Sequence, residues 1–117
     1  MRRRSSPIVW RMNRYPFSLI KSGKRQTLVY AGYASIKRIQ IGDVIKIISG
    51  SDSLLIEITS RIVYPTIIDM AEREDLSKIG PGKPPDETLS RLEELFPPKK
   101  EILGIYVFHI KAVPDGS

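Results

Sequence analysis

Alternating apolar residues mark the beginning of this chain as a strand. Ile8, Trp10 and Met12 fall on one side of an extended backbone, and the residues between them fall on the other. Four later segments alternate in the same way or are rich in β-branched and aromatic residues. The predicted strands span residues 7–14, 26–33, 44–48, 54–63 and 103–113. Turn-forming residues 49–53 separate the third from the fourth, so these two strands are expected to form a hairpin.

Helical spacing and helix-boundary residues mark the segments between the strands. A short helix is predicted over residues 16–22, with Pro16 in its first turn and Gly23 just after its end. A second helix is predicted over residues 66–74, with Thr66 as its N-cap and apolar residues facing inward. These inward residues are Ile67, Ile68 and Met70.

A third helix is predicted over residues 86–96, because apolar residues follow one stripe of it and two prolines end it. The stripe consists of Leu89, Leu92, Leu95 and Phe96. Residues 80–85 break the chain before this helix, and their Gly-Pro-Gly start is interpreted as a rigid turn. Residues 35–39 are expected to form a short turn or a helical bend.

The order of these elements indicates a small α+β domain around a curled, barrel-like sheet. Strands and helices do not alternate regularly, so a parallel dinucleotide-binding sheet is not expected. Residues 7–113 are assigned to this one domain. Residues 1–6 are expected to be a disordered basic arm, and residues 114–117 are expected to be a tail.

Charge is distributed unevenly along the chain. The whole sequence of 117 residues carries a formal charge of +6. Residues 1–42 contain ten basic and no acidic residues, whereas residues 43–117 carry a net charge of −4. Such an asymmetry favours a polyanionic partner, most often nucleic acid, and a solvated charged surface is the alternative explanation.

The composition argues against several classes of function. The chain has no cysteine, which excludes disulfides, a cysteine nucleophile and thiolate zinc sites. Its one histidine, His109, falls in the last predicted strand and is interpreted as structural. The carboxylates of residues 69–75 are interpreted as a solvated face, and no glycine-rich phosphate-binding motif occurs. We therefore expect no metal ion and no cofactor. No apolar run is long enough for a bilayer, so a cytoplasmic protein without a membrane partner is expected.

A cluster of cations around Gly23 carries the strongest functional signal. Lys21, Lys24 and Arg25 flank this glycine, where a chain reversal would hold them on one rim. The aromatic and basic residues that follow are Tyr30, Tyr33, Lys37 and Arg38. Cations pair with phosphates and tyrosines stack on bases, a combination suited to single-stranded nucleic acid. The alternative for either tyrosine is a barrel residue whose hydroxyl is tied to the backbone.

Four stretches of the sequence, in order, resemble the activating signal cointegrator homology (ASCH) domain, a family of the PUA-like superfamily. The first stretch is residues 19–25 together with residues 33–45, in which the spacing from Gly23 to Gly42-Asp43 matches the family pattern. The other three stretches are residues 74–81, 89–97 and 104–108. The similarity spans residues 9–112 and looks closest to single-domain archaeal members.

The resemblance implies a small PUA-like mixed β-barrel of five to six strands, with two to three helices at its openings. It also implies a cleft lined by the loop around Gly23 and by the strand after it. The family is generally regarded as nucleic-acid binding, chiefly RNA. Our main hypothesis is therefore a domain that binds RNA or single-stranded nucleic acid and has no chemistry of its own. The residues expected to contact phosphate are Lys21, Lys24, Arg25, Lys37 and Arg38, with Arg11 and Arg14 extending the track and Tyr30 or Tyr33 stacking on a base.

The resemblance also carries an enzymatic alternative. One bacterial branch of the family hydrolyses acetylated cytidine with a lysine, a threonine and a glutamate. These positions correspond here to Arg25, Leu28 and Glu74, or Glu72 if the alignment is shifted. Only the carboxylate matches. The alternative is a ribonuclease or a hydrolase of modified nucleosides that uses Glu74 as acid or base, with Lys24 or Arg25 stabilising charge. A third hypothesis is a module that docks on a translation (ribosomal) or transcription protein.

Overall fold

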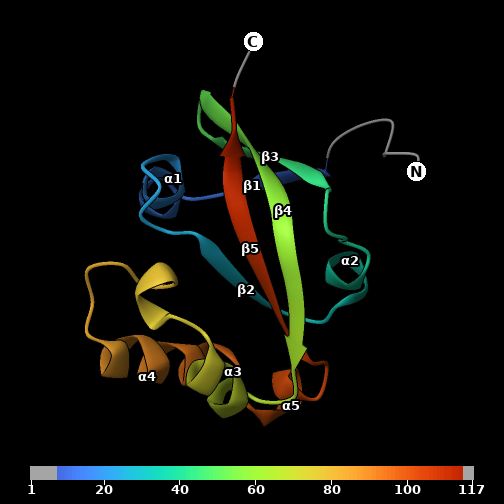
Figure 1. Cartoon of the computed structure of the whole chain (residues 1–117), viewed down its shortest axis with the longest axis vertical. Coiled ribbons are helices and arrows are strands. Elements are labelled where there is room, and N and C mark those ends of the chain that lie inside the picture. Colours follow the sequence, from blue (N-terminus) through green and yellow to red (C-terminus); the bar gives the residue numbers. More distant parts are fainter. Residues whose placement is uncertain (1–7, 115–117) are drawn as a thin grey trace.

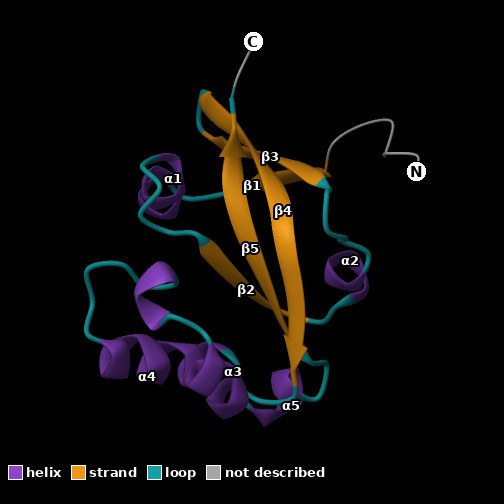
Figure 2. Cartoon of the chain, viewed as in Figure 1, coloured by secondary structure: helices purple, strands orange, loops and turns teal. Residues whose placement is uncertain are grey.

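A single five-stranded sheet organises the chain, and helices cover parts of both its faces (Figures 1 and 2). The structure, a computed structural model, describes residues 8–114. In sheet order the strands are β1 (Ile8–Arg11), β3 (Val44–Ser49), β4 (Asp52–Tyr64), β5 (Ile105–Val113) and β2 (Thr27–Ala31). The helices are α1 (Arg14–Lys21), α2 (Ala34–Lys37), α3 (Ile67–Arg73), the 3₁₀-helix η1 (Leu76–Lys78), α4 (Pro85–Leu95) and α5 (Pro98–Glu101).

The sheet is mixed and curls into a half-barrel. β1 runs parallel to β3, and the β3–β4, β4–β5 and β5–β2 pairs are antiparallel. β4 pairs with β5 along most of its length, and its register shifts between Ile58 and Ser60 because of a β-bulge, which increases local twist. The outer strands β1 and β2 approach each other through side chains, with the Trp10 and Tyr30 ring centroids 5.1 Å apart. The expected small, barrel-like α+β fold is therefore confirmed.

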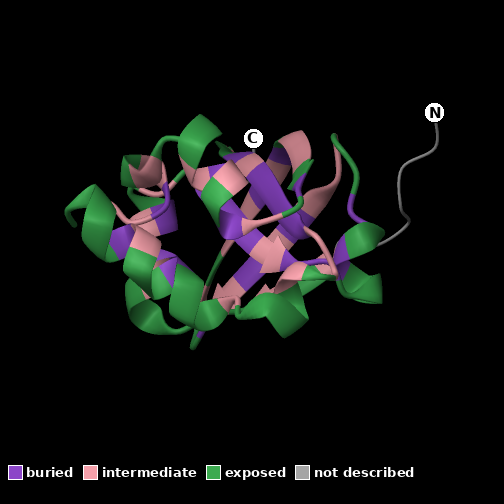
Figure 3. Ribbon diagram, turned by 90° about the horizontal axis from the view of Figure 1, so that it is seen from below, coloured by how far each residue is buried: buried purple, intermediate pink, exposed green. Residues whose placement is uncertain are grey.

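Two hydrophobic cores lie on opposite faces of the sheet. The first fills the curl of the half-barrel, where α1 contributes Phe17 and Ile20 and α2 contributes Ile36. The second lies under the helices α3, η1 and α4 at one end of the molecule. Figure 3 shows the buried residues gathered between the sheet and these helices, with exposed residues on the outer helix faces.

The sequence of β5 explains how one strand serves both cores. Its residues Ile105 and Val107 belong to the core beneath the helices, and Tyr106 and Phe108 belong to the core inside the curl. Successive side chains of a strand point to opposite faces, so a strand covered on both sides is apolar at every position. The continuous apolar run in the predicted last strand therefore indicates a strand that is covered on both faces.

The hairpin and the N-cap were predicted correctly. β3 and β4 are antiparallel and joined by a tight turn, with Ser49 opposite Asp52. The Oγ1 of Thr66 accepts a hydrogen bond from the Asp69 amide at 3.1 Å, as an N-cap does.

Other boundaries differ from the prediction. The first helix begins at Arg14, two residues before Pro16. A fifth α-helix, α5, begins at Pro98, the second of the two prolines that were expected only to end α4. Proline is compatible with the first turn of a helix, which allows both starts. Ile68 was expected to face inward but is exposed, and so is Leu95 at the edge of the α4 stripe.

The expected basic arm lies outside the described residues, as do residues 115–117 of the tail. Within residues 8–114, no helix has the length and apolar character needed to cross a membrane.

Candidate nucleic-acid interface

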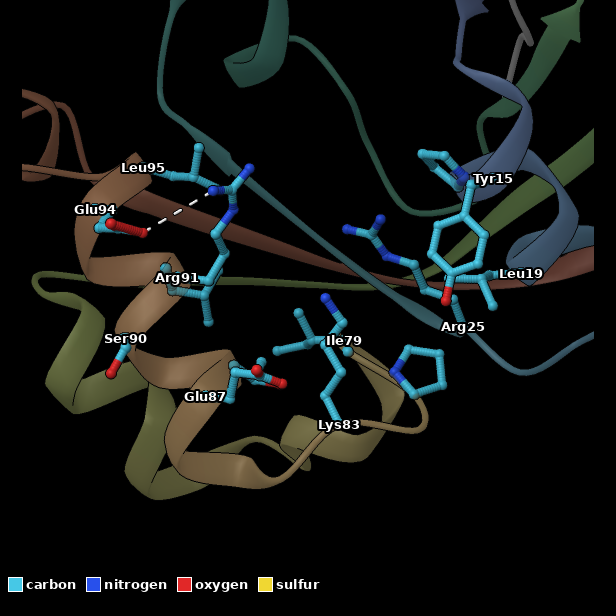
Figure 4. A pocket seen from close by; sticks show the side chains of 15 residues that line it. Tyr15, Leu19, Arg25, Ile79, Lys83, Glu87, Ser90, Arg91, Glu94 and Leu95 are labelled. Carbon is cyan, nitrogen blue, oxygen red and sulfur yellow. Dashed lines mark ion pairs between the residues drawn. The ribbon is translucent and has the colours of Figure 1, made fainter.

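A cavity of about 540 Å³ lies between α1, the start of β2, the loop after η1, and α4. Tyr15 and Leu19 of α1 form one wall, and α4 supplies much of the opposite wall. Figure 4 shows Arg25 on one side of the cavity and Arg91, paired with Glu94, on the α4 side, with the Lys83 side chain between the two. The cavity therefore brings together cations from three separate parts of the chain.

Arg25 is held in place by the turn that joins α1 to β2. Gly23 has a φ of +79°, a backbone conformation that glycine adopts readily, and this lets the chain reverse after α1. The Arg25 amide donates to the Leu19 carbonyl at 3.0 Å, and its Nε donates to the Thr27 carbonyl at 3.3 Å. Burial lowers the pKa of the Arg25 guanidinium, which nevertheless stays charged at neutral pH.

The loop after η1 presents Lys83 through a tight turn. The Lys83 amide donates to the Gly80 carbonyl at 3.3 Å, and Gly82 has a φ of +82°. Proline at the second position and a left-handed glycine at the third are the residues that such a turn requires. The interpretation of Gly80-Pro81-Gly82 as a turn is therefore correct, and the turn places a lysine at the cavity.

The α4 wall carries charges of both signs. Arg91 lies 3.9 Å from Glu94 in an exposed ion pair, and Glu87 lines the cavity one turn earlier. Exposed pairs of this kind contribute little to stability, so Arg91 remains available to a ligand.

The cations around Gly23 have different surroundings. Lys21 and Lys24 are exposed, and the Lys21 Nζ lies 6.0 Å from the centre of the Phe17 ring. Arg25 is the member of this group that lines the cavity. The structure therefore places Lys21 and Lys24 outside the cavity, beside its α1 side.

The tyrosines differ in what their rings contact. Tyr30 packs against Trp10 and Phe108, and burial raises the pKa of its hydroxyl. Tyr33 is 52% exposed, so of the two predicted tyrosines it has the more accessible ring. Tyr15, which no sequence pattern indicated, is 63% exposed and lies directly at the cavity.

The cations of α2 lie away from the cavity. In the view of Figure 1, α2 is drawn at the right of the sheet and α1 and α4 at its left, and no residue of α2 is among those that line the cavity. Lys37 and Arg38 are exposed there, and Arg61 ties this segment to β4 by donating to the Ile39 and Lys37 carbonyls. The structure therefore does not bring Lys37 and Arg38 together with Arg25.

The two arginines expected to extend the track have different surroundings. Arg11 is exposed at the end of β1. Arg14 donates to Asp52 Oδ2 at 2.6 Å, and this hydrogen bond holds the pKa of Asp52 below its usual range.

Glu74 lies in a hydrogen-bonded cluster rather than on a solvated face. Its side chain is 6% exposed, its Oε2 accepts from the Tyr64 hydroxyl at 2.6 Å, and its Oε1 lies 2.7 Å from His109 Nε2. An ionised carboxylate only accepts, so this contact is a hydrogen bond in the tautomer of His109 that carries a proton on Nε2. Burial, followed by the hydrogen bond that the Tyr64 hydroxyl donates to Glu74, raises the pKa of Tyr64 to about 12. Both oxygens of Glu74 are thus occupied, and Glu74 is not among the residues that line the cavity.

Several cavity residues carried only weak signals in the sequence. Lys83, Glu87, Thr88 and Arg91 come from the acidic part of the chain, where no basic cluster directs attention to them. The available signals were the turn before Lys83 and the position of Arg91 between two leucines of the apolar stripe. Their meeting with Arg25 depends on the packing of α4, which sequence spacing does not specify.

The fold that carries this cavity occurs in other solved structures. The hypothetical protein PH0355 has a TM-score of 0.71 and 22% identity, over 91% of this chain and 100% of its own. Protein PF0455 from Pyrococcus furiosus has a TM-score of 0.69 and 25% identity, over 91% of this chain and 98% of its own. The ASCH domain from Lactobacillus crispatus has a TM-score of 0.54 and 21% identity, over 81% of this chain and 68% of its own.

These comparisons confirm the resemblance to the ASCH domain at the level of the fold. No protein-family model matches the sequence, and no curated protein matches it either.

Proposed function

We propose that this chain binds RNA or another single-stranded nucleic acid through the cavity and the basic rim beside it. The observation that carries the proposal is the convergence of Arg25, Lys83 and Arg91 on one open cavity, with the exposed ring of Tyr15 at its side. Guanidinium and ammonium groups pair with phosphates, and exposed aromatic rings stack on unpaired bases.

The basic rim gives the proposed interface a continuation outside the cavity. Lys21 and Lys24 are exposed at the end of α1 and in the turn after it, next to Arg25. A strand that enters the cavity can thus keep its backbone near further cations as it leaves. The ASCH-like fold adds support, because the resemblance to that family implies nucleic-acid binding.

The surroundings of Glu74 favour binding over hydrolysis. A general acid or base must reach the proton that it transfers, and both oxygens of Glu74 already contact Tyr64 and His109. The enzymatic alternative also requires Glu74 to share a site with Lys24 or Arg25, whereas the cavity is lined by Arg25 without Glu74.

The proposal is tested by equilibrium binding of a labelled single-stranded RNA of mixed sequence. Replacing both Lys24 and Arg25 with Ala should weaken binding about tenfold or more, because each phosphate contact contributes electrostatically. The loss should be similar for RNAs of different sequence, since phosphate contacts carry no sequence information.

The matched control replaces Lys99 and Lys100 with Ala, which removes the same charge from exposed positions in and beside the first turn of α5. This variant should bind as the unmodified protein does. Equal weakening in both variants, or no binding by the unmodified protein at low salt, would refute the proposal.

A further inference from the structure

The charges around the cavity suit a ligand with groups of both kinds. Arg25, Lys83 and Arg91 are positive, and Glu87 is a carboxylate with no ion pair in the described part of the chain. A nucleotide offers a phosphate to the cations. Adenine, guanine and cytosine also offer an exocyclic amino group, which a carboxylate accepts, whereas uracil has none.

The size and the apolar surface of the cavity match such a ligand. Its volume of about 540 Å³ lies within the range of small-molecule sites. Leu19, Ile79 and Leu95 provide apolar surface, and the Tyr15 ring lies on the α1 side. The flat face of a base is stabilised by contacts of this type.

We infer that the cavity holds one nucleotide of a bound strand and prefers a base with an exocyclic amino group. The inference rests on the proposed function and adds a specificity site to it. Arg25, Lys83 and Arg91 bind the phosphate, and Glu87 accepts a hydrogen bond from the amino group.

Competition with single nucleotides tests this inference. AMP, CMP, UMP, cytidine and inorganic phosphate are each titrated against the protein bound to labelled single-stranded RNA. AMP and CMP should displace the RNA, and UMP should compete about fivefold less well, the ratio expected for one lost hydrogen bond of about 1 kcal/mol. Cytidine and inorganic phosphate should both compete less well than CMP, because cytidine lacks the phosphate and inorganic phosphate lacks the base.

Substitutions on α4 locate the preference. Glu87→Gln should remove the preference for CMP over UMP, while Glu93→Gln, an exposed neighbour on the same helix outside the cavity lining, should retain it.

The outcomes separate this inference from the proposed function. RNA binding that no mononucleotide displaces, or displacement by CMP and UMP with equal affinity, would overturn the inference while leaving the proposed function intact. Absence of RNA binding at low salt would overturn the proposed function itself. A preference for CMP that persists in Glu87→Gln would also contradict the assigned role of this carboxylate.

Discussion

At the scale of single residues, the cluster of Glu74, Tyr64 and His109 shows how a charged group stabilises this fold. The three side chains come from the end of α3, from β4 and from β5, so their hydrogen bonds join the helices to the sheet. The buried carboxylate of Glu74 is compensated by two donors, and removing either donor leaves it partly unpaired. We therefore interpret Glu74 as a structural residue of the helix–sheet junction.

The raised pKa of Tyr64 leads to a pH-dependent stability prediction. Its phenol ionises near pH 10 in an unfolded chain and at about 12 in the folded one, so its contribution is full below pH 10. That contribution is lost as the pH rises toward 12. At pH 8, Tyr64→Phe should lower the free energy of unfolding by about 1.5 kcal/mol, the lower end for a hydrogen bond to a charged group.

Urea unfolding at pH 8 and near pH 11 measures this difference. The gap between the two proteins should narrow at the higher pH, and Tyr33→Phe, at an exposed ring, should change stability little at either pH. A gap that is absent at pH 8, or that widens with pH, would show that the Tyr64–Glu74 bond does not stabilise the fold.

At the scale of secondary-structure elements, the junction between β2 and α2 depends on close backbone approach. Gly32 follows β2, and its amide donates to the Gly104 carbonyl at 3.0 Å. A Cβ at this position would lie 2.2 Å from the Leu103 carbonyl oxygen and 2.5 Å from the Tyr106 ring. The backbone at Leu103 cannot move away cheaply, so this position requires glycine.

Gly32→Ala should lower the free energy of unfolding by more than about 2 kcal/mol, because overpacking against backbone forces a shift of the strand. Gly50→Ala is the matched control: φ there is +59° and nothing lies within 4 Å of the added Cβ. That variant should lose only about 1 kcal/mol, the cost of a left-handed backbone. Equal losses in the two variants, measured by urea unfolding, would contradict the steric account.

Sequence periodicity predicts elements well where local pattern and burial agree. The β3–β4 hairpin has strong turn residues, and Thr66 is an N-cap by residue type, so both are found where the sequence indicates. Sequence periodicity fails where tertiary packing determines the structure. α5 is a single turn that begins at Pro98, the second of the two prolines, and Leu95 is exposed at the cavity although it continues an apolar stripe.

The candidate site was predicted only in part, for a related reason. Arg25 and its neighbours form a cluster along the chain, which the sequence displays directly. The opposite wall comes from α4, more than fifty residues later, and its position depends on the core formed with α3 and the sheet. No local pattern specifies that packing, so the contribution of Lys83 and Arg91 to the site could be recognised only from the fold.

At the scale of the whole molecule, the uneven charge along the sequence does not correspond to one basic face. Arg25 from the basic first third lines the same cavity as Lys83 and Arg91 from the acidic remainder, while Lys37 and Arg38 are not among the residues that line it. The cations that line the cavity therefore come from both the basic first third and the acidic remainder of the chain. The site proposed here is defined by this convergence rather than by net charge.

The salt dependence of RNA binding tests this central claim most directly. For a single strand, the logarithm of affinity falls with the logarithm of salt concentration by about 0.7 for each phosphate neutralised. Three converging cations therefore predict a slope of about −2 or steeper, and replacing both Lys83 and Arg91 with Ala should make it shallower by about 1.4. The Lys99→Ala, Lys100→Ala variant should keep the original slope. A slope near zero, or one that the Lys83 and Arg91 substitutions leave unchanged, would contradict the account.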